Sequence, residues 1–125
     1  MKIYLAGPMR GLPNFNFPAF DFAAHKLRNE GHFVFSPAER DRAIYGEKLE
    51  DNATGDEKQA EASVGFSIRE ALAADTDWIA KQADAIALLP GWEKSSGVAA
   101  ELALAIAIGL EIQYLGQEYI PWYMR

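Results

Sequence analysis

One carboxylate stands out in this sequence because it lies in an otherwise apolar predicted helix. Glu101 falls in residues 98–108, where every other side chain is apolar. A helix that is apolar on all sides is usually buried, and buried carboxylates are rare unless they are paired or functional. Glu101 is therefore either a nucleophile or base in an apolar pocket, or an acid near a helix start that the helix dipole stabilises by less than ~1 kcal/mol.

The loop before this helix has the composition of an anion site. It follows an apolar predicted strand at residues 85–89 and supplies these candidate contacts: Pro90, Gly91, Trp92, Ser95, Ser96 and Gly97. Free amides at a helix start, two hydroxyls and a glycine can bind an anion such as phosphate. Serine and glycine also serve simply as caps, so both roles stay open. Trp92 is typical of packing, although it lies where a nucleobase could stack.

A second loop follows the first predicted strand, residues 2–6, and begins with Gly7, Pro8, Met9 and Arg10. In open parallel sheets, ligands bind beyond the carboxyl ends of the strands, so this loop is expected to meet the loop before Glu101. Arg10 is then a candidate ligand for an anion, with a surface arginine as the alternative. A tyrosine inside a strand, such as Tyr4, is more often part of the core than catalytic.

Three aspartates could supply a second carboxylate beside Glu101. Asp75 and Asp77 lie in a predicted helix at residues 67–81, and Asp84 precedes the strand at residues 85–89. Their alternatives are a solvated helix face and a turn role. A pair of carboxylates, one nucleophile and one acid/base, is what cleavage of a glycosidic bond requires.

Length and charge limit the class of protein. A chain of 125 residues suits one domain, and its net charge of −6 argues against nucleic acid polymers and anionic membranes as partners. The apolar helix is too short for a bilayer, which needs ~20 residues, and the chain opens directly into a strand without a signal-peptide pattern. We therefore expect a cytoplasmic protein. Without cysteine it has no disulfides or thiolate metal sites, and no cofactor is expected.

Strands alternate with helices along the chain. The patterns predict strands at residues 2–6, 33–36, 85–89 and 111–115, and helices at 18–30, 67–81 and 98–108. This order predicts a single α/β domain, a flavodoxin- or Rossmann-like three-layer sandwich with a parallel sheet of four to five strands. Because it has no polar face, the helix that contains Glu101 is expected to be the most buried one.

Residues 39–65 do not fit this alternation. They are polar and charged and show no helical or strand periodicity, with Ile44, Tyr45 and Leu49 as the main apolar anchors. So long a structureless segment is unusual inside a domain. It is interpreted as a lid, a binding loop or a partly disordered insert, and as the most mobile part of the chain. As a lid, it would order over a bound nucleotide.

Four stretches together resemble the nucleoside 2-deoxyribosyltransferase superfamily, which includes the deoxynucleoside 5′-monophosphate N-glycosidases. They are residues 4–11 (YLAGPMRG), 75–79 (DTDWI), 83–89 (ADAIALL) and 95–97 (SSG) with Glu101. The opening of the chain through residue 20 also resembles small uncharacterised proteins that are often encoded by phages.

The resemblance implies a role for each matching residue. Glu101 matches the nucleophile that forms a glycosyl-enzyme intermediate, and Asp75 matches the acid/base, with Asp77 as the nearby alternate. Tyr4 matches a tyrosine beside the nucleophile, and Arg10 an arginine near the substrate. The implied activity is hydrolysis or transfer at the N-glycosidic bond of a small nucleoside or nucleotide.

The loop residues also bear on the choice between hydrolase and transferase. Ser95 and Gly97 match the loop that holds a 5′-phosphate in the monophosphate hydrolases, and with Ser96 and Arg10 they favour a hydrolase. Family members are commonly oligomers, and residues 119–124 (YIPWYM) form an apolar tail, so a homodimer or higher homo-oligomer is expected.

Two other functions remain open. One is a non-catalytic nucleotide-binding or sensing module with the same fold. The other is hydrolysis at the nicotinamide–ribose bond of a dinucleotide, which would need a longer cleft than the sequence indicates.

Overall fold

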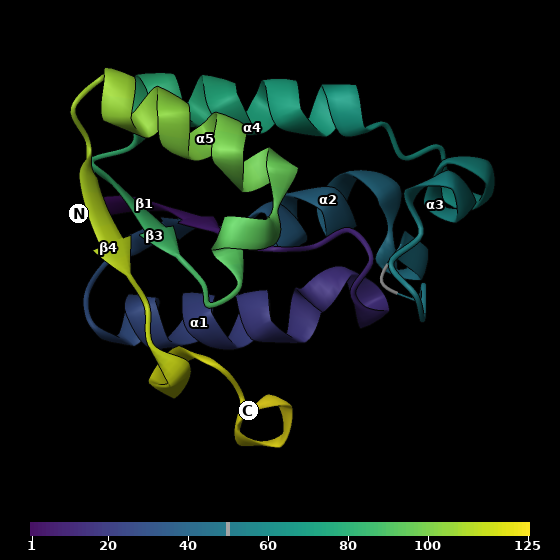
Figure 1. The fold of residues 1–125 in the computed structure, drawn as a ribbon. Coiled ribbons are helices and arrows are strands. Elements are labelled where there is room, and N and C mark those ends of the chain that lie inside the picture. The colour runs from purple at the N-terminus through teal and green to yellow at the C-terminus, as the bar shows by residue number, and fades with distance from the viewer. Residues whose placement is uncertain (50) are drawn as a thin grey trace.

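The computed structural model describes residues 1–49 and 51–125, and for residues 63 and 64 the backbone alone. Within these residues the centre is a four-stranded parallel sheet. Its order is β2 (Phe33–Phe35), β1 (Lys2–Ala6), β3 (Ala85–Leu88) and β4 (Glu111–Tyr114). Helices cover both faces, as Figure 1 shows. The prediction of a Rossmann-like α/β sandwich is confirmed.

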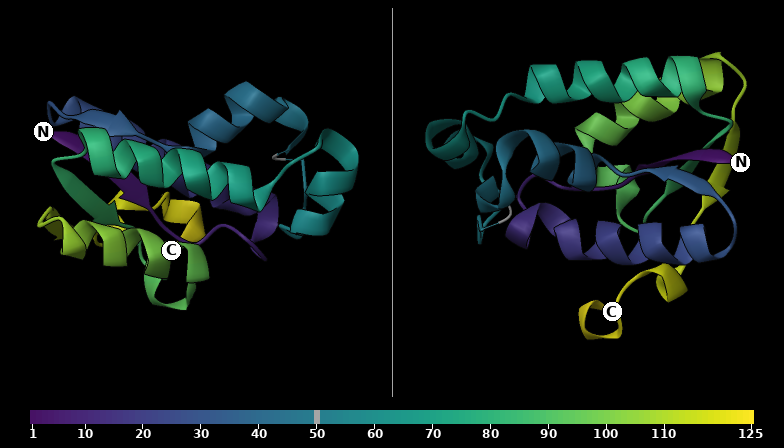
Figure 2. Two further views of the ribbon diagram at one scale, coloured as in Figure 1. Left: turned by 90° about the horizontal axis from the view of Figure 1, so that it is seen from above. Right: turned by 180° about the vertical axis from the view of Figure 1, so that it is seen from behind.

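The helices divide into three groups by position. On one face lies α1 (Phe17–Asn29), and on the other lie α4 (Ile68–Gln82) and α5 (Ser96–Ala107) (Figures 1 and 2). Beyond the carboxyl ends of β1 and β2 lie α2 (Pro37–Tyr45) and α3 (Glu57–Val64). No helix of the described residues has the length and apolar character to cross a membrane.

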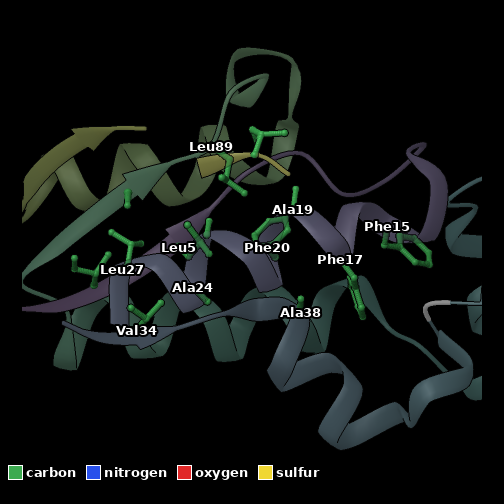
Figure 3. Packing of buried hydrophobic residues seen from close by; sticks show 14 of the residues in the cluster. Leu5, Phe15, Phe17, Ala19, Phe20, Ala24, Leu27, Val34, Ala38 and Leu89 are labelled. Atoms are coloured by element: carbon green, nitrogen blue, oxygen red, sulfur yellow. The ribbon is translucent and has the colours of Figure 1, made fainter. Parts of the chain in front are cut away.

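The alternation of side chains along β1 assigns each residue to one layer. Ile3 and Leu5 pack against α1, in the core that Figure 3 shows around Phe20 and Leu27. Tyr4 points to the opposite face and packs with residues of α4 and α5. Because successive side chains of a strand point to opposite faces, β1 supplies the core with one set and the α4/α5 side with the other.

The expectation that α5 is the most buried helix is wrong. Only Val98, Glu101 and Ala105 of α5 are buried, whereas α1 buries six residues. Ile106 is 60% exposed and Ile108, just past the helix, is 45% exposed, while Leu104 is half-buried. The physical reason is the layered fold, in which a helix covers the sheet with one side only. Its other side remains apolar and open.

The expectation of a structureless segment at residues 39–65 is also wrong. It contains most of α2, a 3-10 turn at Glu47–Leu49, and α3. Leu49 is buried, and Tyr45 packs edge-on against Phe66, while Ile44 is exposed. Residue 50 of this segment lies outside the described part of the chain. Short helices with few apolar positions show too little periodicity to be found from the sequence.

Candidate active site

A hydrogen bond between β1 and α5 lies at the centre of the candidate site. The hydroxyl of Tyr4, which is fully buried, donates to Oε2 of Glu101 at 2.5 Å. The same hydroxyl lies close enough to the Asp75 carboxyl of α4 for each group to influence the pKa of the other. Three separate elements therefore bring Tyr4, Asp75 and Glu101 together, the three residues for which the resemblance implied a shared site.

Both carboxyl groups are buried, and this raises their pKa values. Asp75 is 6% exposed and Glu101 is 7% exposed. Burial, and after it the negative charge of Asp41, raises the pKa of Asp75 to about 7. Burial raises the pKa of Glu101 to about 8, against the opposing effect of the hydrogen bond from Tyr4. At neutral pH the pair therefore retains a proton.

The higher pKa of Glu101 would leave this proton on Glu101, but the direct hydrogen bond from Tyr4 favours a negative charge there and so favours Asp75 as the holder of the proton. A distance of 2.5 Å is typical of a hydroxyl that donates to an ionised carboxylate, so Glu101 is the group whose negative charge is stabilised. Oδ1 of Asp75 is buried and has no hydrogen-bond partner among the described residues. A negative charge left on such an oxygen would be costly. The arrangement is thus one ionised carboxylate beside one neutral carboxyl group.

A third buried carboxylate, Asp41, belongs to the same site and was missed from the sequence. It is 3% exposed, and its Oδ1 accepts a hydrogen bond from Nη1 of Arg40 at 3.0 Å. Burial raises its pKa to about 6, while Arg40 opposes the rise. One signal was available: a proline at residue 37 favours a helix start there, and Asp41 then lies one turn later on the same face as Pro37.

The three carboxylates line one inner cavity of about 70 Å³. Apolar side chains line the cavity as well, among them Phe15, Phe17, Leu49 and Phe66. Gly7, Met9, Arg10, Ser95 and Gly97 also line this cavity, so the two predicted loops do meet at the carboxyl ends of the strands. A Cβ at Gly7 would come within 2.8 Å of the Leu89 side chain, so this position accommodates only glycine without a shift.

A larger outer cleft of about 780 Å³ shares Met9, Arg10 and Ser95 with the inner cavity. Pro8, Pro90, Gly91 and Ser96 lie on its walls. At the junction, the guanidinium of Arg10 donates to Ser96 at 2.6 Å and forms an ion pair with Glu57 of α3 at 3.1 Å. Arg10 thus places a positive charge between the inner cavity and the outer cleft.

Ser95 precedes α5 and Ser96 is its first residue, and the two serines have different roles. The Oγ of Ser95 accepts a hydrogen bond from the backbone amide of Val98, which is the capping role that the composition left open. Ser95 nevertheless lines both the inner cavity and the outer cleft. The start of α5, with its partial positive charge, therefore faces the same space as Arg10.

Three candidate residues lie outside this arrangement. Asp77 is on the exposed side of α4, where it pairs with Lys81 at 2.8 Å. Trp92 lines neither the inner cavity nor the outer cleft and packs near Tyr114, with ring centroids 5.8 Å apart. Asp84 accepts a hydrogen bond from the backbone amide of Lys2 at 2.8 Å, which is a structural role.

Among the described residues, no group of three or more His, Cys, Asp and Glu side chains is arranged to hold a metal ion. The site therefore offers its own carboxyl groups, a tyrosine hydroxyl and a guanidinium as reactive or binding groups.

Comparison with known proteins places the chain in a family. No curated protein and no solved structure matches it. A family model, described as a domain of unknown function (DUF4406), matches residues 1–114. That range includes the whole sheet and every residue of the inner cavity, so the chain belongs to the DUF4406 family.

Proposed function

We propose that this protein cleaves the N-glycosidic bond of a nucleoside 5′-monophosphate and releases the free base. The observation that supports this most is the pair formed by Asp75 and Glu101, two buried carboxyl groups in one cavity. Glu101 accepts a short hydrogen bond from Tyr4, whereas Oδ1 of Asp75 has no partner among the described residues. Cleavage through a covalent intermediate requires one ionised carboxylate and one protonated carboxyl group.

The reaction would proceed in two steps. In the first, an Oε atom of Glu101 attacks the anomeric carbon, the bond between that carbon and the base nitrogen breaks, and Asp75 gives its proton to the departing base. In the second, the oxygen of a water molecule attacks the anomeric carbon while Asp75 takes a proton from that water. The bond between Glu101 and the anomeric carbon breaks, and Glu101 leaves as a carboxylate. The products are the free base and the sugar phosphate with retained configuration.

The phosphate would lie at the junction between the inner cavity and the outer cleft. Arg10, Ser96 and the start of α5 offer a positive charge, a hydroxyl and the partial positive charge of a helix N-terminus there. An approaching phosphate would compete with Glu57 for Arg10. Exposed ion pairs of this kind contribute ~1 kcal/mol or less, so this competition costs little.

A dinucleotide is the second candidate substrate. The outer cleft of about 780 Å³ continues past Arg10, so there is room for a group attached to the phosphate. Hydrolysis of a nicotinamide–ribose bond would use the same Asp75 and Glu101.

The test is a panel of ribo- and deoxynucleosides, their 5′-monophosphates and a nicotinamide dinucleotide, with free base measured by chromatography. We expect base release from at least one phosphorylated compound and little from the matching nucleoside. Addition of a second free base distinguishes transfer from hydrolysis. Failure to release base from every compound would instead support a nucleotide-binding module.

The paired variants are Asp75→Asn and Asp77→Asn, on the buried and exposed sides of the same helix. Loss of a general acid should lower the rate by about 10²–10⁴-fold, and only in Asp75→Asn. Equal rates in the two variants would contradict the role of Asp75.

A further inference from the structure

The buried carboxylate of Asp41 has no part in the two steps above, although α2 places it in the same inner cavity as Asp75 and Glu101. Burying a charge costs several kcal/mol, and the ion pair with Arg40 could form equally well at the surface. Asp41 also lies beyond the first turn of α2, which begins at Pro37, so neither capping nor the helix dipole explains an acid there.

The surroundings of Asp75 indicate what Asp41 does. The charged and titratable groups that share the inner cavity with Asp75 or act on its pKa come from four elements: Tyr4 from β1, Arg10 from the loop after β1, Arg40 and Asp41 from α2, and Glu101 from α5. Of the α2 pair, Asp41 carries the negative charge that disfavours ionisation of Asp75, and Arg40 carries the positive charge that favours it. The two side chains therefore act on Asp75 in opposite directions.

We propose that Asp41 is a positioning residue that keeps the proton of the site on Asp75, and that Arg40 limits how strongly it does so. The proposal rests on the proposed function in so far as Asp75 is the general acid. A negative charge beside Asp75 disfavours loss of its proton until the departing base accepts it. After that transfer, the same charge favours return of a proton from the attacking water to Asp75. Asp41 itself forms no bond to the substrate in either step.

The direct test is a titration of the Asp75 carboxyl carbon by NMR in the free protein, labelled with ¹³C at aspartate Cγ. We expect Asp41→Asn to lower the titration midpoint of Asp75 by about one pH unit, because a like charge has been removed. Arg40→Gln should raise the midpoint, because an opposite charge has been removed. If Arg40 and Asp41 had only a structural role, the two variants would not move the midpoint of Asp75 in opposite directions.

The proposal is overturned if neither variant moves the midpoint, or if both move it the same way. If Asp41→Asn does not fold, as judged by its amide NMR spectrum, the direction of the shift in Arg40→Gln decides the matter. Substrate is not needed for this titration. If the wild-type protein releases no base, the proposed function fails while the coupling between Asp41 and Asp75 is still tested.

A second readout uses the pH dependence of base release. The alkaline limb reports ionisation of Asp75, so it should move to lower pH in Asp41→Asn and to higher pH in Arg40→Gln. If the wild-type protein is active and the alkaline limb moves in neither variant, the proposed role of Asp41 is wrong. The proposed role of Asp75 as the acid is not affected by that result.

Discussion

At the scale of single residues, the site depends on how the hydrogen bonding of two buried carboxyl groups, those of Asp75 and Glu101, differs. Glu101 accepts a short hydrogen bond from Tyr4, whereas Oδ1 of Asp75 has no partner among the described residues. Burial raises the pKa of both groups. Tyr4 also lowers the pKa of Asp75, but its short hydrogen bond is made to Glu101, and this contact is what distinguishes the two groups.

The first prediction concerns Tyr4. Tyr4→Phe keeps the ring, which stacks on Phe35, and removes the hydrogen bond to Glu101. A hydrogen bond to a charged group contributes ~1.5–3 kcal/mol, so we expect base release to slow by about 10–100-fold. The pKa of Glu101 should rise further, because this hydrogen bond holds it down, and the acidic limb of the pH profile should move to higher pH.

The control for this variant is Tyr114→Phe, since Tyr114 is exposed on β4. The assignment would be wrong if Tyr4→Phe and Tyr114→Phe gave the same rate and the same acidic limb.

The second prediction concerns stability and pH. Burial raises the pKa of Asp75 to about 7 in the folded chain, above its value of ~3.9 when unfolded. The folded state therefore binds more protons between these values, and the free energy of unfolding falls as pH rises from about 4 to about 8. Asp75→Asn removes this contribution, so the variant should lose less stability than the wild-type protein over that range.

Urea unfolding at several pH values measures this difference, with Asp77→Asn as the exposed control on the same helix. Parallel curves for wild-type protein and Asp75→Asn would show that burial of this carboxyl group has no energetic cost.

At the scale of elements, the sequence predicted the framework better than the connection between β2 and α4. Four strands and the helices that became α1, α4 and α5 were found from periodicity. Ser67 caps α4, since its hydroxyl accepts a hydrogen bond from the backbone amide of Glu70. α2 and α3 were missed because their residues are mostly polar. Asp41 was therefore missed with α2, and Pro37 at the start of that helix was the one signal that could have placed it.

The third prediction concerns residues 52–55, which lie between β2 and α4 and contact the loop after β1. The backbone of residues 52–55 accepts hydrogen bonds from Gly11 at 2.9 Å and Asn14 at 2.8 Å. Gly55 has a φ of +70°, and a Cβ there would overlap the backbone of Leu12. Gly55→Ala should therefore destabilise the protein by more than Gly46→Ala, by about 1–3 kcal/mol.

Gly46 is the matched comparison because its φ is +83° and a Cβ there would meet open space. Urea unfolding of the two variants gives the difference. Equal losses of stability would mean that the close approach of Gly55 to Leu12 is absent in solution.

At the scale of the whole molecule, the sequence predicted the layers but not which surfaces they leave open. The apolar pattern of α5 was interpreted as full burial, whereas one side of the helix faces outward with Ala103 and Ile106. The aromatic end of the chain is divided similarly, since Ile120 is buried and Trp122 is 79% exposed. Periodicity cannot distinguish burial against the sheet from burial against a second chain.

The fourth prediction concerns assembly. We expect a homodimer that covers the outward side of α5, because apolar patches of this kind are rarely left exposed on a monomer. Ile106→Glu would bury a charge in that contact and should yield a monomer, measured as the mass in light scattering at micromolar concentration.

Ile44→Glu is the control, because Ile44 is a similarly exposed isoleucine on α2. A monomeric wild-type protein would contradict the expectation. So would a dimer that dissociates in Ile44→Glu but stays intact in Ile106→Glu.

The central claim is that Glu101 is a covalent nucleophile, and the rate of base release by Glu101→Gln tests it most directly. The comparison uses the best substrate of the panel, wild-type protein and Glu93→Gln, an exposed control in the loop before α5. Glu101→Gln keeps the shape of the side chain and removes its nucleophilic charge. We predict a loss of several orders of magnitude in Glu101→Gln and none in Glu93→Gln. A folded Glu101→Gln protein that releases base at nearly the wild-type rate would contradict the mechanism.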